Sequence, residues 1–343
     1  MTVTAVTPQA RVSSKAFDWL VLAGSSWIIA GGYLDAWAHQ HGKVDDTFFT
    51  PWHGLLYAGL VVTGLILTIR GLLSIRAGLS MRAGLSLRAG RAWREALPYG
   101  YGLSFVGCVL FLVFGALDLG WHTLFGIEAN VAALLSPTHL GLMASGFLAV
   151  SGPWRADRGP TTSYVAVLSA SLVVAEFWFF AQYDIPYSSP WPGIRADQPA
   201  FLDLGTQLGI DGVIVATVTV MGVLLFLLRD RPVPPGTVTL LVGIPATLNV
   251  LAVDPPSAGT LIGAAVLGGI LGDVALRLTG AGGLGLRVAS ALIPLLLWSV
   301  YMAAVQIAYG MQWEIHLWTG TIVVSAAVGY LLSFLAVPPA SRR

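Results

Sequence analysis

Charge and cysteine are the two things that this sequence has least of. Only 10% of its 343 residues are charged, the formal net charge is +1, and Cys108 is the one cysteine. A single cysteine excludes an internal disulfide bond and a metal site built from several thiolates. With so little net charge and no basic stripe between aromatic residues, no nucleic-acid partner is expected. The absence of a Gly-x-Ser-x-Gly elbow removes the support for a hydrolase of the Ser-His-Asp type.

Apolar residues dominate the composition instead. They make up 56% of the chain, and the mean hydropathy is +0.77. Such values predict an all-α fold, a polytopic helical bundle in a lipid bilayer. A helix needs roughly 20 mostly apolar residues to cross a bilayer. Ten segments are expected to do so: 17–38, 53–74, 99–122, 138–154, 162–183, 205–228, 236–253, 258–276, 288–309 and 315–337.

The chain is expected to form a single membrane domain over residues 1–343. Within it we distinguish a tail over 1–16, a part with two similar helical hairpins over 17–154, and the remaining helices over 155–343.

The basic residues predict the orientation of these segments. If the N-terminus is cytoplasmic, sixteen of the eighteen Lys and Arg residues fall on the cytoplasmic side, and only Lys43 and Arg195 lie outside. This asymmetry is typical of multi-pass proteins of the cell (inner) membrane. It predicts an even number of spans with both termini in the cytoplasm. All six histidines then lie near the extracytoplasmic face.

Two stretches of the chain repeat one pattern of ionisable residues. The pattern is Gly-x-Leu-Asp-x3-His, a loop, and then Pro-x-His-x4-Ala. Its first copy consists of Gly32, Leu34, Asp35, His39, Pro51, His53 and Ala58. Its second copy consists of Gly115, Leu117, Asp118, His122, Pro137, His139 and Ala144. The repetition predicts that the first two hairpins, helices one and two and helices three and four, are an internal repeat that carries a site.

The spacing within each copy predicts a metal site. Residues four apart lie on one face of a helix, so the Asp and the first His of each copy can face one point. Thr50 and Ser136 precede the prolines as expected N-caps, which puts the second His of each copy in the first turn of the next helix. Two imidazoles and one carboxylate suit copper, iron or zinc. The sequence leaves open whether the two sets form one dinuclear centre or two separate sites.

The first stretch also resembles the metal-binding segment of the C subunit of the particulate methane monooxygenase and ammonia monooxygenase family. The matching positions are Asp35, His39 and His53, with support from Gln40, Asp46, Thr47, Phe49, Thr50 and Pro51. A looser match runs through Asp118, Trp121, His122, Pro137 and His139. The resemblance covers about 20 residues twice. It implies copper as the cofactor. Iron and zinc stay open as alternatives on the donor set alone, and haem is less favoured.

Two glutamates are candidate proton-transfer groups for a metal-dependent reaction. Glu176 is expected about two turns from the outer end of the fifth segment, and Glu314 at the start of the tenth. Ionisable residues are costly within a membrane and commonly mark a function. His41 and His316 are interpreted as structural residues at the membrane interface. The candidate pocket lining is aromatic: Trp37, Phe48, Phe49, Trp52, Trp121, Phe125 and Trp178.

These features favour a metal-dependent membrane oxidoreductase, similar to a monooxygenase, that acts on a small or lipophilic substrate. The alternatives are a transporter or metal-handling protein, an electron-transfer protein with haem b, and a zinc-dependent hydrolase. The lipid bilayer is the expected surrounding, and both partner subunits and a homo-oligomer stay open.

Overall fold

The computed structural model describes residues 12–43, 49–81, 96–126, 131–195, 199–229 and 231–336. These parts of the chain are helical and contain no strand. The helices of the first part are α1 (Lys15–Gln40), α2 (Pro51–Met81), α4 (Tyr101–Phe125), α5 (Val131–Leu135), α6 (Pro137–Val150), α7 (Gly152–Ala156) and α8 (Tyr164–Phe180). The remainder are η1 (Trp191–Gly193), α9 (Pro199–Leu228), α10 (Thr237–Val253), α11 (Ala258–Thr279), α12 (Gly283–Tyr309) and α13 (Ile315–Ala336).

The helices have the length and composition of a membrane-embedded bundle. Among the described residues, seven are long and apolar enough to cross a bilayer, namely α1, α2, α4, α9, α11, α12 and α13. α8 and α10 are shorter apolar helices of 17 residues each. Each of the ten segments expected from the sequence overlaps a helix, so the all-helical prediction is confirmed.

Several helix boundaries differ from the expected ones. The fourth segment is divided at Ser151 into α6 and the short α7, because Pro153 in the first turn of α7 has no backbone N–H to continue the helix. α9 begins at Pro199 instead of 205, and α12 begins at Gly283 instead of 288. The predicted turn between the seventh and eighth segments is present, with Asp254 at φ 50° after the last residue of α10.

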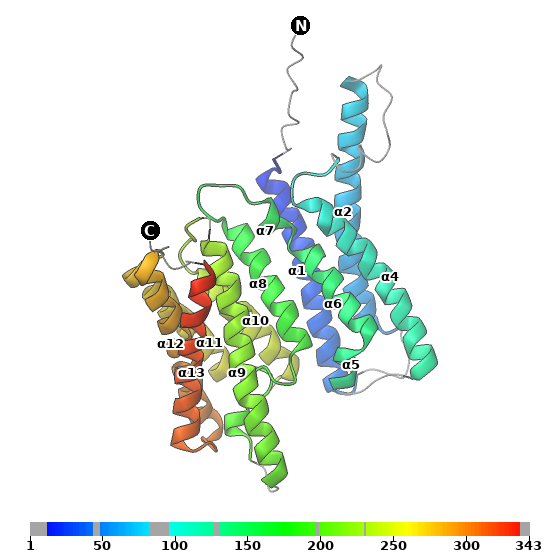
Figure 1. Ribbon diagram of the computed structural model, residues 1–343. Helices are drawn as coiled ribbons and strands as arrows, with labels where there is room; N and C mark the ends of the chain where they lie inside the picture. Colours follow the sequence, from blue (N-terminus) through cyan, green and yellow to red (C-terminus); the bar gives the residue numbers. More distant parts are fainter. Residues whose placement is uncertain are drawn as a thin grey trace.

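The bundle contains two groups of helices, which Figure 1 shows side by side. α1, α2, α4 and α6 enclose one apolar core, and α8 to α13 enclose a larger one. A third cluster, with residues of α1, α8 and α10, joins the two groups, and α1 packs against both α8 and α10. The helices of the first group contribute the repeated histidines.

Glycines allow the helices of the first group to approach closely. A Cβ atom at Gly107 of α4 would lie 2.5 Å from the backbone nitrogen of Ala149 in α6. A Cβ atom at Gly31 of α1 would lie 2.8 Å from the Cα atom of Leu56 in α2. Such backbone approaches are typical of helix pairs in membranes. They fix each hairpin, and therefore the position of the residues at its open end.

The end of α1, the start of α2, the end of α4 and the start of α6 all lie at one end of the bundle (Figure 1). The start of α1 and the end of α13 lie at the opposite end. The repeated Asp and His residues are thus at the end of the bundle away from both described chain ends.

Candidate metal centres

The first candidate centre, called site one, consists of Asp35, His39 and His53. Asp35 and His39 lie in the last turns of α1, and His53 lies in the first turn of α2. The backbone N–H of His53 donates to Thr50 Oγ1 over 3.1 Å, which confirms Thr50 as the cap of this helix start. The expected convergence of α1 and α2 is therefore present.

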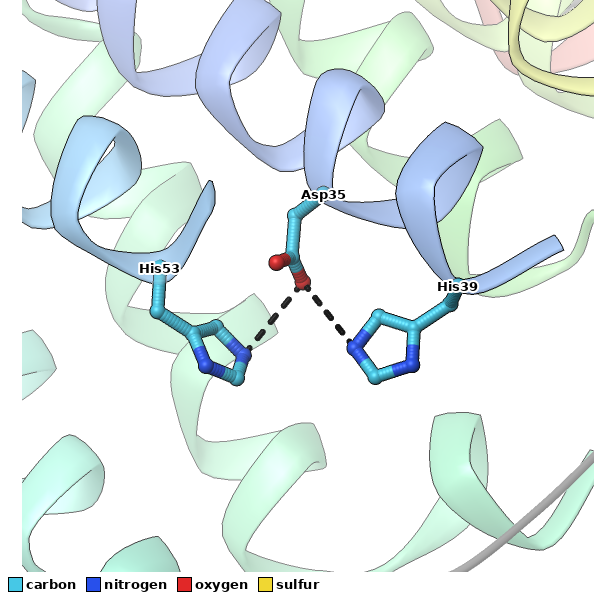
Figure 2. A group of neighbouring side chains, drawn as sticks. All are labelled: Asp35, His39 and His53. Atoms are coloured by element: carbon cyan, nitrogen blue, oxygen red, sulfur yellow. Dashed lines mark ion pairs between the residues drawn. The ribbon is translucent and has the colours of Figure 1, made fainter. Parts of the chain in front are cut away.

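Both imidazoles of site one face the same carboxylate oxygen. Asp35 Oδ2 lies 3.7 Å from His39 Nε2 and 3.3 Å from His53 Nε2. Figure 2 shows the two rings approaching this oxygen from opposite sides. The second oxygen, Asp35 Oδ1, is buried and has no hydrogen-bond partner among the described residues. A buried carboxylate oxygen without a partner is costly, and a bound cation removes that cost.

The second candidate centre, called site two, consists of Asp118, His122 and His139. Asp118 and His122 lie near the end of α4, and His139 lies in the first turn of α6. Asp118 Oδ2 lies 3.3 Å from His122 Nε2, and Asp118 Oδ1 lies 3.3 Å from His139 Nδ1. The two centres therefore have the same composition and the same placement on their hairpins.

A hydroxyl group holds the carboxylate of site two. Thr138 Oγ1 donates to Asp118 Oδ1 over 2.6 Å, and both side chains are buried. The predicted cap Ser136 accepts from the backbone N–H of His139 at 3.4 Å and lies 2.7 Å from His139 Nδ1. In site one the position of Thr138 is taken by Trp52, whose indole N–H donates to Lys43 O instead. This substitution explains why Asp35 Oδ1 lacks the hydrogen bond that Asp118 Oδ1 receives.

The two ring nitrogens of His122 face two different acceptors. Nδ1 lies 3.3 Å from the backbone carbonyl oxygen of Gly126, and Nε2 lies 3.3 Å from Asp118 Oδ2. A neutral ring donates to only one of these acceptors, whereas a ring that binds a metal ion through Nε2 donates from Nδ1 to the carbonyl oxygen. A carbonyl acceptor on the distal nitrogen is the usual arrangement of a metal-bound histidine.

The donor spacing of both sites fits a transition-metal ion. In each site one ligand atom from each residue lies within 4.8 Å of the others. Ligand bonds of about 2.1 Å in a tetrahedral site place the donor atoms about 3.4 Å apart, close to the Asp–His separations of 3.3 to 3.7 Å found here. The six residues form two groups of three.

The two sites differ in exposure. The side chain of His39 is 44% exposed, whereas that of His122 is 11% exposed and that of Asp118 is 4% exposed. Site one is thus the more open of the two, and site two the more enclosed.

Four aromatic residues of the predicted lining lie within three residues of a candidate ligand in the chain: Trp37, Trp52, Trp121 and Phe125. The ring of Trp37 stacks on His41 at a centroid distance of 4.8 Å and lies 6.0 Å from the ring of Trp52. The rings of Trp121 and Phe125 lie 4.5 Å apart near site two. Trp178 lies instead in the larger apolar core, stacked on Tyr187. Phe48, Asp46 and Thr47 lie outside the described residues.

Glu176 is buried in the bundle and not at either metal site. Its side chain is 5% exposed, and Oε2 has no hydrogen-bond partner among the described residues. A Cβ atom at Gly146 of α6 would lie 1.8 Å from Glu176 Oε1, so the carboxyl group packs directly on α6. Gly146 is seven residues after His139, which places it two turns further along the same face of α6.

Glu314 lies in a different part of the molecule from the two sites. It precedes α13, in the second group of helices, and lines a cavity with Trp191, Phe201 and Trp313. His316 is exposed in the first turn of α13. The sequence placed Glu314 on the correct side of the bundle, but the lateral order of the helices separates it from the histidine triads.

No protein-family model, curated protein or solved structure matches this chain. The function is therefore inferred from the geometry of its own residues.

Proposed function

We propose that this chain is a multi-pass protein of the cell membrane that binds one transition-metal ion at each of two sites and uses them in redox chemistry. In this proposal the chain crosses the membrane ten times, and α6 and α7 together form the fourth span. Both termini are cytoplasmic, in agreement with the distribution of Lys and Arg. The two hairpins, α1 with α2 and α4 with α6, are copies of one unit.

One observation supports metal binding above all others. Two separate hairpins each bring an Asp and two His residues together, with ligand atoms within 4.8 Å of one another. A structural role for one such group needs only a hydrogen bond between Asp and His. It does not account for the same three residue types at the same places in both hairpins.

The donor set supports redox chemistry. Two imidazoles and a carboxylate leave coordination positions open, and a redox-active metal with open positions can bind and activate dioxygen. Copper is the metal that the resemblance implies, while iron and zinc accept the same donors. Haem has no equatorial position for the carboxylate that lies between the two imidazoles of site one (Figure 2).

The residues of this chain have different roles at the two sites. His39 leaves site one open, so a small or lipophilic substrate can approach there, next to the rings of Trp37 and Trp52. Thr138 fixes the carboxylate of site two by its hydrogen bond of 2.6 Å. Glu176 is the candidate proton group, buried against α6 about 10 Å along the helix from His139.

Several deep polar residues join helices to one another. Both donor hydrogens and the acceptor oxygen of the Asn249 amide are engaged, by Tyr33, Pro245 and Ser188. The indole N–H of Trp298 donates to Thr217 over 2.7 Å. Other buried polar atoms, Glu176 Oε2, Trp178 Nε1 and Tyr187 OH, have no hydrogen-bond partner among the described residues. Transport therefore stays the alternative function.

The test is metal analysis of the purified protein in lipid, with optical and paramagnetic spectra. Replacement of His53 and His139 together by Ala removes one ligand from each site. We expect this variant to lose both metal ions and its metal-dependent redox activity while it keeps its helical content. Retention of bound metal by a folded double variant would contradict the proposal.

A further inference from the structure

A cavity in the second group of helices lies away from both metal sites. It has a volume of about 180 Å³ and lies between the loop before α9, the first turns of α9 and the start of α13. Its wall contains the rings of Trp191, Phe201 and Trp313 and the carboxylate of Glu314. We refer to it as the aromatic cavity. Pockets for drug-sized ligands usually measure 300 Å³ or more, so this one suits a group of a few heavy atoms.

Two glycines of α9 fix the tryptophan rings. A Cβ atom at Gly205 would lie 2.7 Å from Trp191 Cε3, and one at Gly209 would lie 2.6 Å from Trp313 Cζ2. The glycines are four residues apart and therefore share one face of α9. Both indoles thus rest directly on the helix surface, and the cavity is formed before a ligand binds.

The two loops that carry the rings are also joined to each other. The backbone N–H of Gln312 donates to the carbonyl oxygen of Pro192 over 2.7 Å. A Cβ atom at Gly193 would lie 2.6 Å from Tyr309 Cβ, so the turn packs closely against the end of α12. A preformed site of this kind loses little conformational entropy when a ligand binds.

The chemistry of the wall selects a cation. The faces of aromatic rings carry negative charge and attract an ammonium group within about 6 Å of the ring centre. The rings of Trp191 and Phe201 contact each other, with centroids 5.8 Å apart and an angle of 58° between the ring planes, and both residues line the cavity. Glu314 adds a carboxylate that forms no ion pair within the described part of the chain, although Arg195 follows Ile194 of the cavity wall.

We infer that the aromatic cavity binds a small alkylammonium group, such as a quaternary ammonium. Such a group occurs in free amino alcohols and in the headgroups of lipids, and the side chains of Phe201 and Glu314 in the cavity wall are exposed. This binding site is independent of the proposed metal sites, because it contains none of their ligands.

The experiment compares choline with its uncharged isostere 3,3-dimethylbutan-1-ol. Calorimetric titration uses the full chain in a maltoside detergent, whose headgroup has no charge. We expect choline to bind at least about tenfold more tightly, because only the cation gains from the rings and from Glu314. Equal affinities, or no binding of choline, would overturn the inference.

Matched variants test the wall. Glu314→Gln and Phe201→Leu alter exposed side chains, and each should weaken choline binding by about threefold. Asp254→Asn removes a carboxylate at an exposed turn outside the cavity, and Phe226→Leu removes a ring at the other end of α9. Both controls should bind choline as the unaltered chain does. A control that weakens binding as much as its partner variant contradicts the assignment.

The source of the ammonium group is distinguished in lipid nanodiscs. If lipid headgroups occupy the cavity, phosphatidylcholine nanodiscs should weaken the binding of free choline relative to phosphatidylglycerol nanodiscs. If the ligand is a free amino alcohol, the two preparations should bind choline equally. In either case the Glu314→Gln variant should bind choline more weakly, and failure of this difference in both lipids refutes the site.

Discussion

The hydroxyl of Thr138 provides the sharpest test of how site two is built. It donates over 2.6 Å to Asp118 Oδ1, and its side chain is buried. Thr138→Val keeps the shape of the side chain and removes this hydrogen bond together with the 3.2 Å contact between the hydroxyl and Ser136 Oγ. Loss of such a contact to a metal ligand typically costs about 10- to 100-fold in metal affinity, or about 1.4 to 2.7 kcal/mol.

The metal affinity of site two can be measured separately from that of site one. In a His53→Ala background site one lacks a ligand, so metal titration reports the remaining site. Thr138→Val should weaken the binding in this background by about 10- to 100-fold. In a His139→Ala background, which leaves only site one, the same substitution should have no effect.

A matched control separates this effect from general loss of stability. Thr219→Val removes a hydroxyl that donates to its own helix, to Val215 O over 2.6 Å. It should leave metal affinity unchanged in both backgrounds. Unchanged affinity after Thr138→Val, or an equal loss at site one, would refute the role of this hydroxyl group.

Three further predictions follow from exposure, packing and charge. Site one should release its metal to a chelator faster than site two, because His39 is 44% exposed and His122 only 11%; equal rates in the two single-site backgrounds would contradict this. Gly107→Ala should lower stability by about 1–3 kcal/mol, since its Cβ atom would lie 2.5 Å from the backbone of α6. A Cβ atom at Gly102 on the same helix meets no atom within 4 Å, so Gly102→Ala should leave stability unchanged. Thermal unfolding of both variants checks the difference. Burial raises the pKa of the Asp184 carboxyl in the loop after α8 from 3.8 to about 6. The folded state therefore binds this proton more tightly than the unfolded state, and stability should fall by at most about 3 kcal/mol as pH rises from 4 to 6. Asp184→Asn should lack this part of the pH dependence, and an unchanged profile in that variant would refute it.

The site was predictable where the signal is local in sequence. Asp35 and His39 share a helix face because they are four residues apart, and Thr50 fixes where the next helix begins. These two local rules already bring His53 towards Asp35. The same rules apply in the second hairpin, and the structure confirms both groups.

What the sequence left open depends on contacts between distant helices. The helices are apolar on nearly all sides, so periodicity does not indicate which face meets which neighbour. It therefore could not place Glu176 against Gly146 or separate Glu314 from the histidines. The role of Thr138 was also missed, although a signal existed: a hydroxyl residue beside the second histidine in one copy and a tryptophan in the other.

The fold shows the same division between local and distant information. The positions of the apolar helices follow from hydropathy, and the turn at Asp254 follows from the prolines after it. The early starts of α9 at Pro199 and α12 at Gly283 were not expected, because their first turns are less apolar than the membrane-spanning parts. The first turn of α9 makes contacts such as that of Phe201 with Trp191.

The most direct test of the account is the number of metal ions bound per chain. The unaltered protein should bind two, His53→Ala and His139→Ala should each bind one, and the double variant should bind none. A single substitution that releases both ions would contradict two separate sites. Two ions retained by the folded double variant would contradict the metal sites themselves.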